Sequence, residues 1–314
     1  MAELAYMQVA RVCNQKCVFC SNPANGRVIT WKEAESLVDR FAKKGFAGLI
    51  LTGGEPTLFK ELPRLISYAI EKGLPPRLIT NGQRTAEKGF LASLAKAGLQ
   101  HIHVSVHSAS AAMQAGLSQN RASLANIQRT LDIAAKLGLR VDINTTICKR
   151  NAGELHVLVA WLMERWPRLK HFVWNNLDPL MNRASLDPSL VPKLRDLEVS
   201  LHLAMTMLDA SGRTFRVDRV PLCFMAEFPH RSTETRKLVK EEDRSIYFLD
   251  QKGLQSQNKH FWTYAKGKPC RSCSLEPVCA GLYQLDVYYS AAELCPSFLS
   301  PDAVRRSILE DEEG

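Results

Sequence analysis

Three cysteines near the N-terminus have the spacing of an iron–sulfur ligand set. Cys13, Cys17 and Cys20 form a C-x3-C-x2-C run. Three thiolates so close in sequence can hold three irons of a [4Fe–4S] cube, which leaves the fourth iron open to a small chelating molecule. The next cysteine is Cys148, far along the chain. A chance cluster and an incomplete zinc site are the alternative interpretations.

The composition limits the class of protein. The chain has 314 residues, of which 46% are hydrophobic and 8% aromatic, and this suits one large globular domain or one domain with a smaller companion. No apolar stretch reaches the roughly 18–20 residues that span a bilayer, and residues 1–5 lack the features of a signal peptide. We therefore expect a cytoplasmic protein with no membrane contact, whose clustered cysteines bind metal rather than form disulfides.

The charge balance says less about the partner. The formal net charge is +9, and a basic enzyme can favour an anionic substrate or nucleic acid. The sequence has no dense Lys/Arg stripe with interleaved aromatic residues. We therefore interpret the excess charge as a solvated basic surface and do not expect nucleic acid as the partner.

The first two thirds of the chain repeats a helix–glycine–strand unit. Helix-like stretches end in a lysine-containing turn and a glycine at Gly45, Gly73, Gly98 and Gly138. Glycine adopts the left-handed cap conformation at no steric cost, and lysine in the last turn is favoured by the helix dipole. Alternating strand and helix signals at this spacing are typical of βα units around a parallel sheet.

These units predict an α/β fold, a partial (βα)6 TIM-like barrel, with a flat doubly wound sheet as the alternative. Strands are predicted near 5–10, 47–52, 77–80, 101–106, 140–147 and 170–175, and helices near 31–44, 60–72, 85–97, 122–137 and 152–165. In either fold the functional face lies at the C-terminal ends of the strands, where the cysteine loop follows the first strand.

The pattern changes after the helix-like segment 188–209. Ser211-Gly212 breaks it, and residues 228–260 are polar and charge-rich without a clear period. We therefore expect a core domain over 1–212 and a small metal-stapled domain over 213–314.

Motifs at successive strand ends make residues 5–210 resemble the radical S-adenosylmethionine (SAM) enzymes. The run Thr52-Gly53-Gly54-Glu55-Pro56 resembles the family motif that contacts the amino group of SAM. Two glycines let a backbone approach a ligand closely, and Glu55 offers a carboxylate to an ammonium. In that family the three cysteines hold a [4Fe–4S] cluster whose open iron binds SAM, and reductive cleavage of SAM releases a 5′-deoxyadenosyl radical.

The resemblance extends to single residues at other strand ends. Thr80 and Asn81 lie in a Thr-Asn-Gly run, and these residues, with Ser105 and Asn144, resemble positions that meet the carboxylate or ribose of SAM. Phe19 stands in the aromatic position beside the adenine. For Thr80 and Ser105 the alternative is an ordinary polar residue that caps a strand. His107 is a candidate catalytic, proton-handling group or a structural histidine.

A second cysteine group resembles the auxiliary-cluster domains called SPASM and twitch. Cys270, Cys273 and Cys279 have the C-x2-C-x5-C spacing, while Tyr283 replaces the next cysteine of the two-cluster version. The resemblance implies one auxiliary [4Fe–4S] cluster. Its fourth ligand is Cys223, which we favour, or Cys295; with neither, an open iron could hold substrate. Structural zinc is the alternative. Cys148 is expected to be a buried apolar residue.

The resemblance implies an enzyme with two [4Fe–4S] clusters and SAM, in which the radical abstracts a substrate hydrogen. The auxiliary cluster would accept an electron or anchor the substrate, and the first cluster would take electrons from a one-electron reductant of the flavodoxin or ferredoxin type. Because the chain begins at the first strand, with no N-terminal peptide-recognition domain, we expect a small metabolite or short peptide as substrate. A peptide-maturing enzyme with a separate recognition protein, an RNA-modifying enzyme and a non-catalytic electron carrier are the alternatives.

Overall fold

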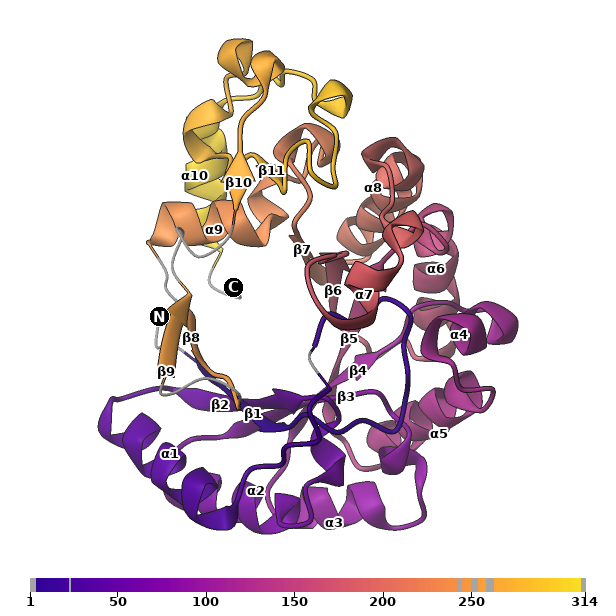
Figure 1. Cartoon of the computed structure of the whole chain (residues 1–314), viewed down its shortest axis with the longest axis vertical. Coiled ribbons are helices and arrows are strands. Elements are labelled where there is room, and N and C mark those ends of the chain that lie inside the picture. Colours follow the sequence, from indigo (N-terminus) through magenta and orange to yellow (C-terminus); the bar gives the residue numbers. More distant parts are fainter. Residues whose placement is uncertain (1–3, 23, 242–243, 250–253, 258–262, 312–314) are drawn as a thin grey trace.

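One curled sheet organises the computed structural model, which describes residues 4–22, 24–241, 244–249, 254–257 and 263–311 (Figure 1). Six strands confirm the predicted ones: β1 (Leu4–Ala10), β2 (Gly48–Gly53), β3 (Pro76–Thr80), β4 (His101–Ser105), β5 (Arg140–Ile147) and β6 (His171–Asn176). Three more are β7 (Thr214–Asp218), β8 (Arg244–Tyr247) and β9 (Leu254–Gln257). Their order in space is β7-β6-β5-β4-β3-β2-β1-β8-β9.

The sheet is a partial barrel, as the βα repeats predict. Neighbouring strands are parallel from β7 to β8, and only β9 runs antiparallel to its neighbour. Helices α1 (Trp31–Lys43), α2 (Leu62–Glu71), α3 (Phe90–Lys96) and α5 (Ser123–Lys136) lie along the outer side of the curled sheet (Figure 1). The alternative of a flat, doubly wound sheet is therefore wrong.

Helix ends and helix faces follow the sequence pattern closely. The four predicted cap glycines all have positive φ angles, as the left-handed cap conformation requires. In α5, Ile127, Leu131 and Ala134 are buried in the main core, as their helical spacing predicts. Helices α6 (Leu155–Arg165) and α8 (Leu194–Ala210) also overlap predicted segments.

Two helices within residues 1–212 were not predicted, α4 (Ala111–Ser118) and α7 (Asn182–Leu186). Each is short, and α4 contains Gly116 and no clear alternation between apolar and polar faces. Periodicity is the main sequence signal for a helix, so a segment without it is read as a loop. Both helices contact the cysteine loop through backbone hydrogen bonds. The prediction therefore lacked two elements that hold this loop in place.

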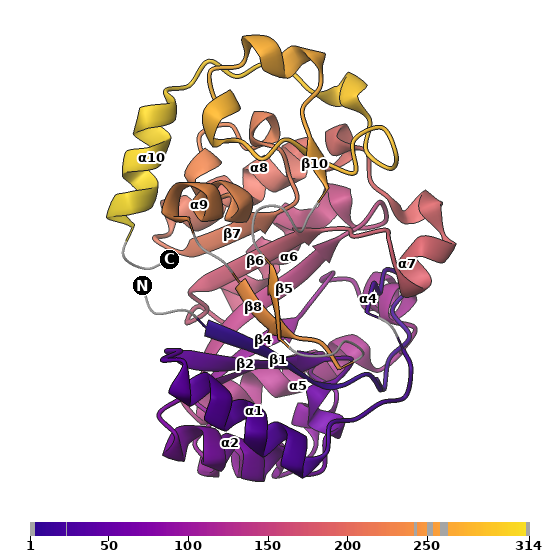
Figure 2. The ribbon, with the colours of Figure 1, turned by 60° about the vertical axis from the view of Figure 1, so that its left-hand side comes forward.

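Beyond residue 212 the chain continues the sheet before it forms the C-terminal region. Strand β7 pairs with β6 and β8 pairs with β1, and both views place β8 and β9 beside β1 (Figures 1 and 2). The polar stretch 228–260 contains α9 (Thr233–Lys240) as well as β8 and β9, followed by β10 (Tyr264–Ala265), β11 (Leu282–Tyr283) and α10 (Pro301–Glu310). The domain boundary near 212 stays a prediction. Of the helices in the described ranges, none is long and apolar enough to cross a membrane.

Candidate active site at the carboxyl ends of the strands

The loop that carries Cys13, Cys17 and Cys20 is held by backbone hydrogen bonds on two sides. On one side, the Glu55 N–H donates to the Val12 carbonyl at 2.9 Å. On the other, the Val18 N–H donates to the Leu117 carbonyl of α4 at 2.9 Å. The loop is thus fixed between the end of β2 and a helix that the sequence did not reveal.

The three thiols of this loop lie close enough to interact electrostatically, as the ligands of one cluster must. Cys13, Cys17 and Cys20 are all free thiols in the structure. Burial, with the neighbouring Cys20 and Cys13 thiolates, raises the pKa of Cys17 to about 12, and burial also raises the pKa of Cys13. A bound cationic cluster would remove this penalty, because it stabilises thiolates that otherwise repel one another. The residues present therefore fit an iron–sulfur cluster.

The two glycines after β2 are required by the packing of one loop on another. A Cβ atom at Gly53 would overlap the Ala10 carbonyl oxygen, and one at Gly54 would overlap the Val12 carbonyl oxygen. Gly53 also has a φ of +144°, which side-chain-bearing residues rarely adopt. The structure thus gives a reason for glycine that the sequence did not suggest: the motif must lie directly against the cysteine loop.

Glu55 is buried and connects β2 to the end of β3. Its Oε1 accepts hydrogen bonds from the hydroxyls of Thr57 and Thr80 at 2.7 and 2.8 Å, and its Oε2 accepts one from the Asn81 N–H at 2.8 Å. Burial raises the pKa of Glu55, although these donors act in the opposite direction. The contact of Glu55 with the SAM ammonium stays a prediction, and the structure adds a second task, that of positioning Thr80 and Asn81.

Asn81 continues this connection to the cysteine loop. Its Nδ2 donates to Asn14 Oδ1 at 2.7 Å and lies 3.7 Å from Cys13 Sγ. The ends of β1, β2 and β3 are therefore joined by one chain of polar contacts that passes through Glu55.

A cavity of about 260 Å³ lies in front of the cysteine loop. Every residue predicted for the first cluster, for SAM and for catalysis lines it, with the exception of Pro56: Cys13, Cys17, Phe19, Cys20, Thr52, Gly53, Gly54, Glu55, Thr80, Asn81, Ser105, His107 and Asn144. Pro56 is buried at the start of the short 3-10 turn η1 (Pro56–Leu58). The fold thus gathers residues from five strand ends around one space.

His107 forms part of the wall as a neutral imidazole. Burial lowers its pKa to about 4. Its Nδ1 accepts a hydrogen bond from the Thr146 N–H at 3.2 Å, and its ring packs edge-on against Phe19 with centroids 4.6 Å apart. An acceptor at Nδ1 fixes the proton of the neutral ring on Nε2. His107 can therefore donate a hydrogen bond near pH 7, and its catalytic role stays a prediction.

Sequence reasoning missed several polar residues of this wall. Asp178, Arg183 and Arg219 line the cavity. Arg183 Nε donates to the Cys17 carbonyl at 2.8 Å, and Arg219 Nε donates to the Asn176 carbonyl at 2.7 Å. Asp178 and Arg219 closely follow β6 and β7. The rule that functional residues follow strand ends would have found both.

The second cysteine group surrounds a much smaller space. Five cysteines line a cavity of about 20 Å³: Cys223, Cys270, Cys273, Cys279 and Cys295. Burial raises the pKa of Cys223 to about 12, and the neighbouring Cys295 and Cys279 thiolates act in the same direction. Both candidate fourth ligands are therefore near the C-x2-C-x5-C group, and the choice between them stays a prediction. Cys148 is buried in a separate apolar cluster, as predicted.

Tyrosines of the C-terminal region reach the wall of the first cavity. The Tyr283 hydroxyl donates to Asp178 Oδ1 at 3.0 Å, and the Tyr289 hydroxyl donates to the Leu177 carbonyl at 2.6 Å. Tyr283 occupies the position where the two-cluster pattern has a further cysteine. In this chain that position connects the two regions.

Comparison with known proteins defines the class of this fold and site. Residues 7–162 match the sequence profile of the Radical SAM superfamily, so the chain contains a radical SAM domain. The chain is 30% identical over 194 residues to a PqqA peptide cyclase of Xanthomonas euvesicatoria pv. vesicatoria, a match that covers 58% of this chain and 50% of the relative. It is 29% identical over 173 residues to an Fe-coproporphyrin III synthase of Methanosarcina barkeri, covering 51% of this chain and 41% of the relative. The chain thus spans about half the length of these curated relatives.

Solved structures extend the likeness of fold over nearly the whole chain. Streptococcus suis SuiB bound to S-adenosylmethionine superposes with a TM-score of 0.64 at 16% identity, covering 90% of this chain and 72% of SuiB. Native anSMEcpe with bound AdoMet and the Cp18Cys peptide gives a TM-score of 0.65 at 14% identity, covering 99% of this chain and 96% of that protein. At these identities the likeness concerns the fold alone.

Proposed function

We propose that this protein cleaves SAM reductively and uses the resulting radical to abstract a hydrogen atom from a substrate. The observation that carries the proposal is the gathering of three free thiols and the predicted SAM residues around one cavity of about 260 Å³. When bound, a [4Fe–4S] cluster and SAM together supply the 5′-deoxyadenosyl radical. The protein holds these groups, orients the substrate and excludes water.

Different residues around the cavity would hold the cluster, bind SAM and contact the substrate. Cys13, Cys17 and Cys20 would hold the cluster, and Arg183 steadies the loop through the Cys17 carbonyl. Residues 52–55 with Thr80, Asn81, Ser105 and Asn144 would bind SAM, and Phe19 would pack beside its adenine. His107 holds a proton on Nε2 in the same wall and can donate a hydrogen bond to substrate.

The C-terminal cysteines would hold one auxiliary [4Fe–4S] cluster. Cys270, Cys273 and Cys279 supply three ligands, and Cys223 or Cys295 supplies the fourth. The small cavity and the five thiols around it support this assignment. With four thiolates the cluster has no open iron and serves as an electron acceptor. A structural zinc ion is the alternative, and metal analysis for iron and zinc distinguishes the two.

We infer a peptide as the first substrate class to test, with a small metabolite as the second. A PqqA peptide cyclase is among the relatives, and SuiB has been solved with its precursor peptide SuiA. An Fe-coproporphyrin III synthase matches nearly as well, so the front half of the chain is compatible with different substrates. The electrons would come from a flavodoxin- or ferredoxin-type reductant in the cytoplasm, where thiols stay reduced.

The test is SAM cleavage by the anaerobically reconstituted full chain. Wild type should contain about eight irons per chain and convert SAM to 5′-deoxyadenosine when reduced. Replacing Cys13, Cys17 and Cys20 together by alanine should remove about half of the iron and all of this product. Product formation by the triple variant would refute the proposal. A Cys148→Ala variant is the cysteine-matched control, because Cys148 lines neither cavity, although it packs in the apolar cluster that contains Phe19.

A further inference from the structure

Two histidines and one aspartate meet inside the curled sheet. His101 and His103 lie on β4, and Asp142 lies on β5. One ring nitrogen of each histidine and one carboxylate oxygen of Asp142 all lie within 4.8 Å of one another. His101 Nε2 is 2.7 Å from Asp142 Oδ2, and His103 Nδ1 is 3.7 Å from the same oxygen. These three residues are called the His–Asp group below.

The His–Asp group lies on the inner face of the sheet, beneath the cysteine cavity. Side chains alternate along a strand, so His101, His103 and Ser105 share one face of β4, in steps of roughly 6–7 Å. Ser105 lines the cysteine cavity, whereas no member of the His–Asp group does. Asp142 is opposite His103 in the β4–β5 register. The group therefore lies deeper in the partial barrel, toward the amino ends of the strands.

His103 is the member of the group whose polar atoms the protein leaves unsatisfied. Its side chain is only 13% exposed. Its Nε2 is buried and has no hydrogen-bond partner among the described residues. Its Nδ1 is 3.7 Å from Asp142 Oδ2, which is too long for a hydrogen bond. Buried polar groups normally have a partner, and an ion between the three residues would supply one.

Asp142 has the orientation of a metal-binding carboxylate. Its side chain is 2% exposed, and its Oδ2 faces the two imidazoles. The other oxygen, Oδ1, accepts a hydrogen bond from Arg140 Nε at 3.5 Å. Carboxylates that bind metals are commonly held by such an outer partner. Arg140 is 59% exposed and lines a cavity of about 540 Å³, so an ion could reach the group past this side chain.

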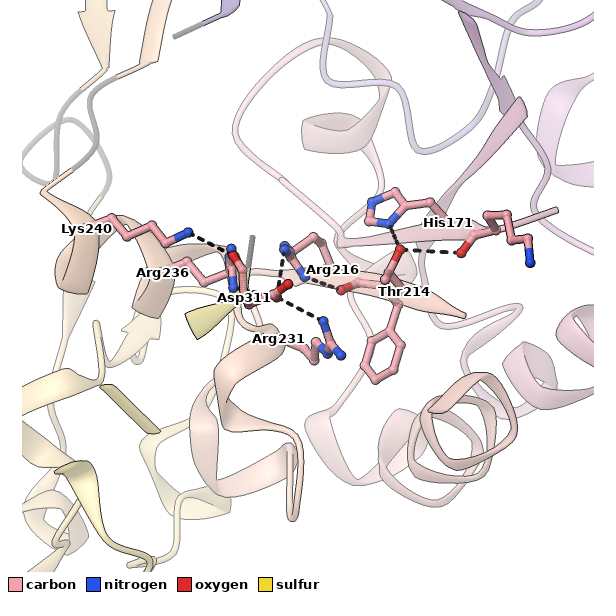
Figure 3. A network of polar contacts seen from close by, with 9 residues as sticks. His171, Thr214, Arg216, Arg231, Arg236, Lys240 and Asp311 are labelled. Carbon is pink, nitrogen blue, oxygen red and sulfur yellow. Dashed lines mark hydrogen bonds and ion pairs between the residues drawn. The ribbon is translucent and has the colours of Figure 1, made fainter. Parts of the chain in front are cut away.

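His171 lies beside the group but uses a ring nitrogen for another contact. It is opposite Asp142 in the β5–β6 register. Its Nδ1 is 2.7 Å from Thr214 Oγ1 on β7 (Figure 3). Within the described part of the chain, no further His, Cys, Asp or Glu joins the three ligand atoms. The protein thus offers three ligands and leaves a fourth coordination position to water, as in zinc centres with three protein ligands.

We propose that His101, His103 and Asp142 bind a zinc ion that ties β4 to β5 inside the barrel. Tetrahedral zinc with bonds of roughly 2.0–2.2 Å has ligand atoms roughly 3.3–3.6 Å apart, and the distances of 2.7 and 3.7 Å bracket this range. On binding, His101 Nε2 gives its lone pair to the ion instead of its hydrogen bond to Asp142, and its ring proton lies on Nδ1. This inference does not rest on the proposed SAM chemistry.

The competing explanation is an ordinary buried hydrogen bond between His101 and Asp142. It accounts for two members of the group and gives His103 no task. Both explanations predict that loss of Asp142 weakens the fold. Only the metal site predicts that His103 is needed for zinc binding. Replacement of His103 by leucine is therefore the informative change, because it removes none of the hydrogen bonds described above.

The experiment is a calorimetric titration of the iron–sulfur-loaded full chain with Zn²⁺ alone, after chelation of loosely bound metal. Wild type should bind one zinc ion at least about 100-fold more tightly than His103→Leu, because loss of even an outer partner costs roughly 10–100-fold in metal affinity. His156→Leu is the matched control, since this half-buried histidine lies on α6 and contacts Ser200. It should bind zinc like wild type. Equal zinc binding by wild type and folded His103→Leu would overturn the proposal.

Zinc held by cysteines does not imitate the expected result, because His103→Leu retains all nine cysteines. The comparison therefore stays valid even if the iron–sulfur assignment fails. Should His103→Leu not fold, X-ray absorption at the zinc edge of the wild type decides. It must show imidazole and oxygen ligands at roughly 2.0–2.2 Å. A shell of sulfur alone, or no bound zinc, would overturn the proposal.

Discussion

The two cysteine groups of this protein differ in how the chain builds them. Cys13, Cys17 and Cys20 come from one loop and face a cavity of about 260 Å³ with polar walls. The C-terminal group brings together cysteines from three distant segments around a space of about 20 Å³, and Cys270 and Cys273 also line a neighbouring cavity of about 550 Å³. A cluster with three protein ligands beside an open cavity can bind a small molecule, whereas one enclosed by four thiolates cannot. If each group holds the cluster that we propose, we predict ligand binding in the first region and electron transfer in the second.

The comparison also explains why the first region needs so many polar connections. The first region surrounds an open cavity, so the protein must hold its loops in place even when no ligand bridges them. Glu55 does this between β2 and β3, and Asn81 extends the connection to the cysteine loop. In the C-terminal cysteine group, the bound metal itself would join the cysteines.

The largest effect is expected from Glu55→Gln, which tests SAM binding in the first region. The amide would place an N–H₂ group where the carboxylate now accepts hydrogen bonds, and it would remove the charge offered to SAM. Charge-assisted contacts are worth roughly 1.5–3 kcal/mol, so the dissociation constant for SAM should rise about tenfold or more. Iron content should stay at the wild-type level.

Equilibrium binding of SAM to the reconstituted protein checks this prediction. Glu61→Gln is the control, because Glu61 is a half-exposed residue that forms an ion pair with Arg64 on the surface. An unchanged dissociation constant in Glu55→Gln would limit Glu55 to a structural role and weaken the assignment of SAM to this cavity.

A smaller effect is expected from replacing the fourth ligand of the C-terminal cysteine group. We predict that Cys223→Ala shifts the spectrum and the potential of the auxiliary cluster, while Cys295→Ala leaves both close to wild type. Cys223 is the more enclosed of the two, since Cys295 is exposed. Electron paramagnetic resonance of each reduced variant gives the answer. The opposite pattern assigns Cys295, and two variants that both behave like wild type would give this site an open iron and remove the contrast between the regions.

The smallest effect per residue is on the pH dependence of stability, to which buried histidines of the curled sheet contribute. Burial lowers the pKa of His103 to about 3 and that of His171 to about 4. In the unfolded chain both protonate near pH 6.5, so the unfolded state binds more protons as the pH falls below that value. Each histidine should therefore cost about 1.4 kcal/mol of stability between about pH 7.5 and 5.5.

Urea unfolding at the two pH values, followed by tryptophan fluorescence, measures this loss. His171→Gln should retain the Thr214 contact and reduce the loss by about 1.4 kcal/mol. Residues 263–311 contain no histidine, so the cysteine-rich part should not add to it. A pH dependence that is the same in His171→Gln and wild type would contradict the assignment.

The sequence was a good guide wherever a local pattern carries the information. Apolar runs and cap glycines predicted six strands of the sheet, because burial and backbone conformation are both set by nearby residues. The cysteine loop and the Gly-Gly motif likewise marked one wall of the cavity. Helix α4 was missed because it has no amphipathic period, and β8 lies in a polar stretch that showed no strand signal.

Contacts between distant residues could not be predicted in this way. The hydrogen bonds that Glu55 accepts from Thr80 and Asn81 join residues 25 and 26 positions apart, and Arg216 and Asp311 are 95 apart. Their meeting depends on how the whole sheet curls and on where the C-terminal region packs. Tyr283 shows the same limit: the sequence marked it as a missing cysteine, and only the structure shows its hydrogen bond to Asp178.

The most direct test of the contrast between the two regions is whether SAM perturbs one cluster and not the other. Two variants each retain a single cysteine group: Cys270→Ala/Cys273→Ala/Cys279→Ala keeps the first, and Cys13→Ala/Cys17→Ala/Cys20→Ala keeps the second. Electron paramagnetic resonance of each reduced protein is recorded with and without SAM. We predict that SAM changes the signal of the first variant and leaves that of the second unchanged. A change in the second variant, or none in the first, would contradict the account.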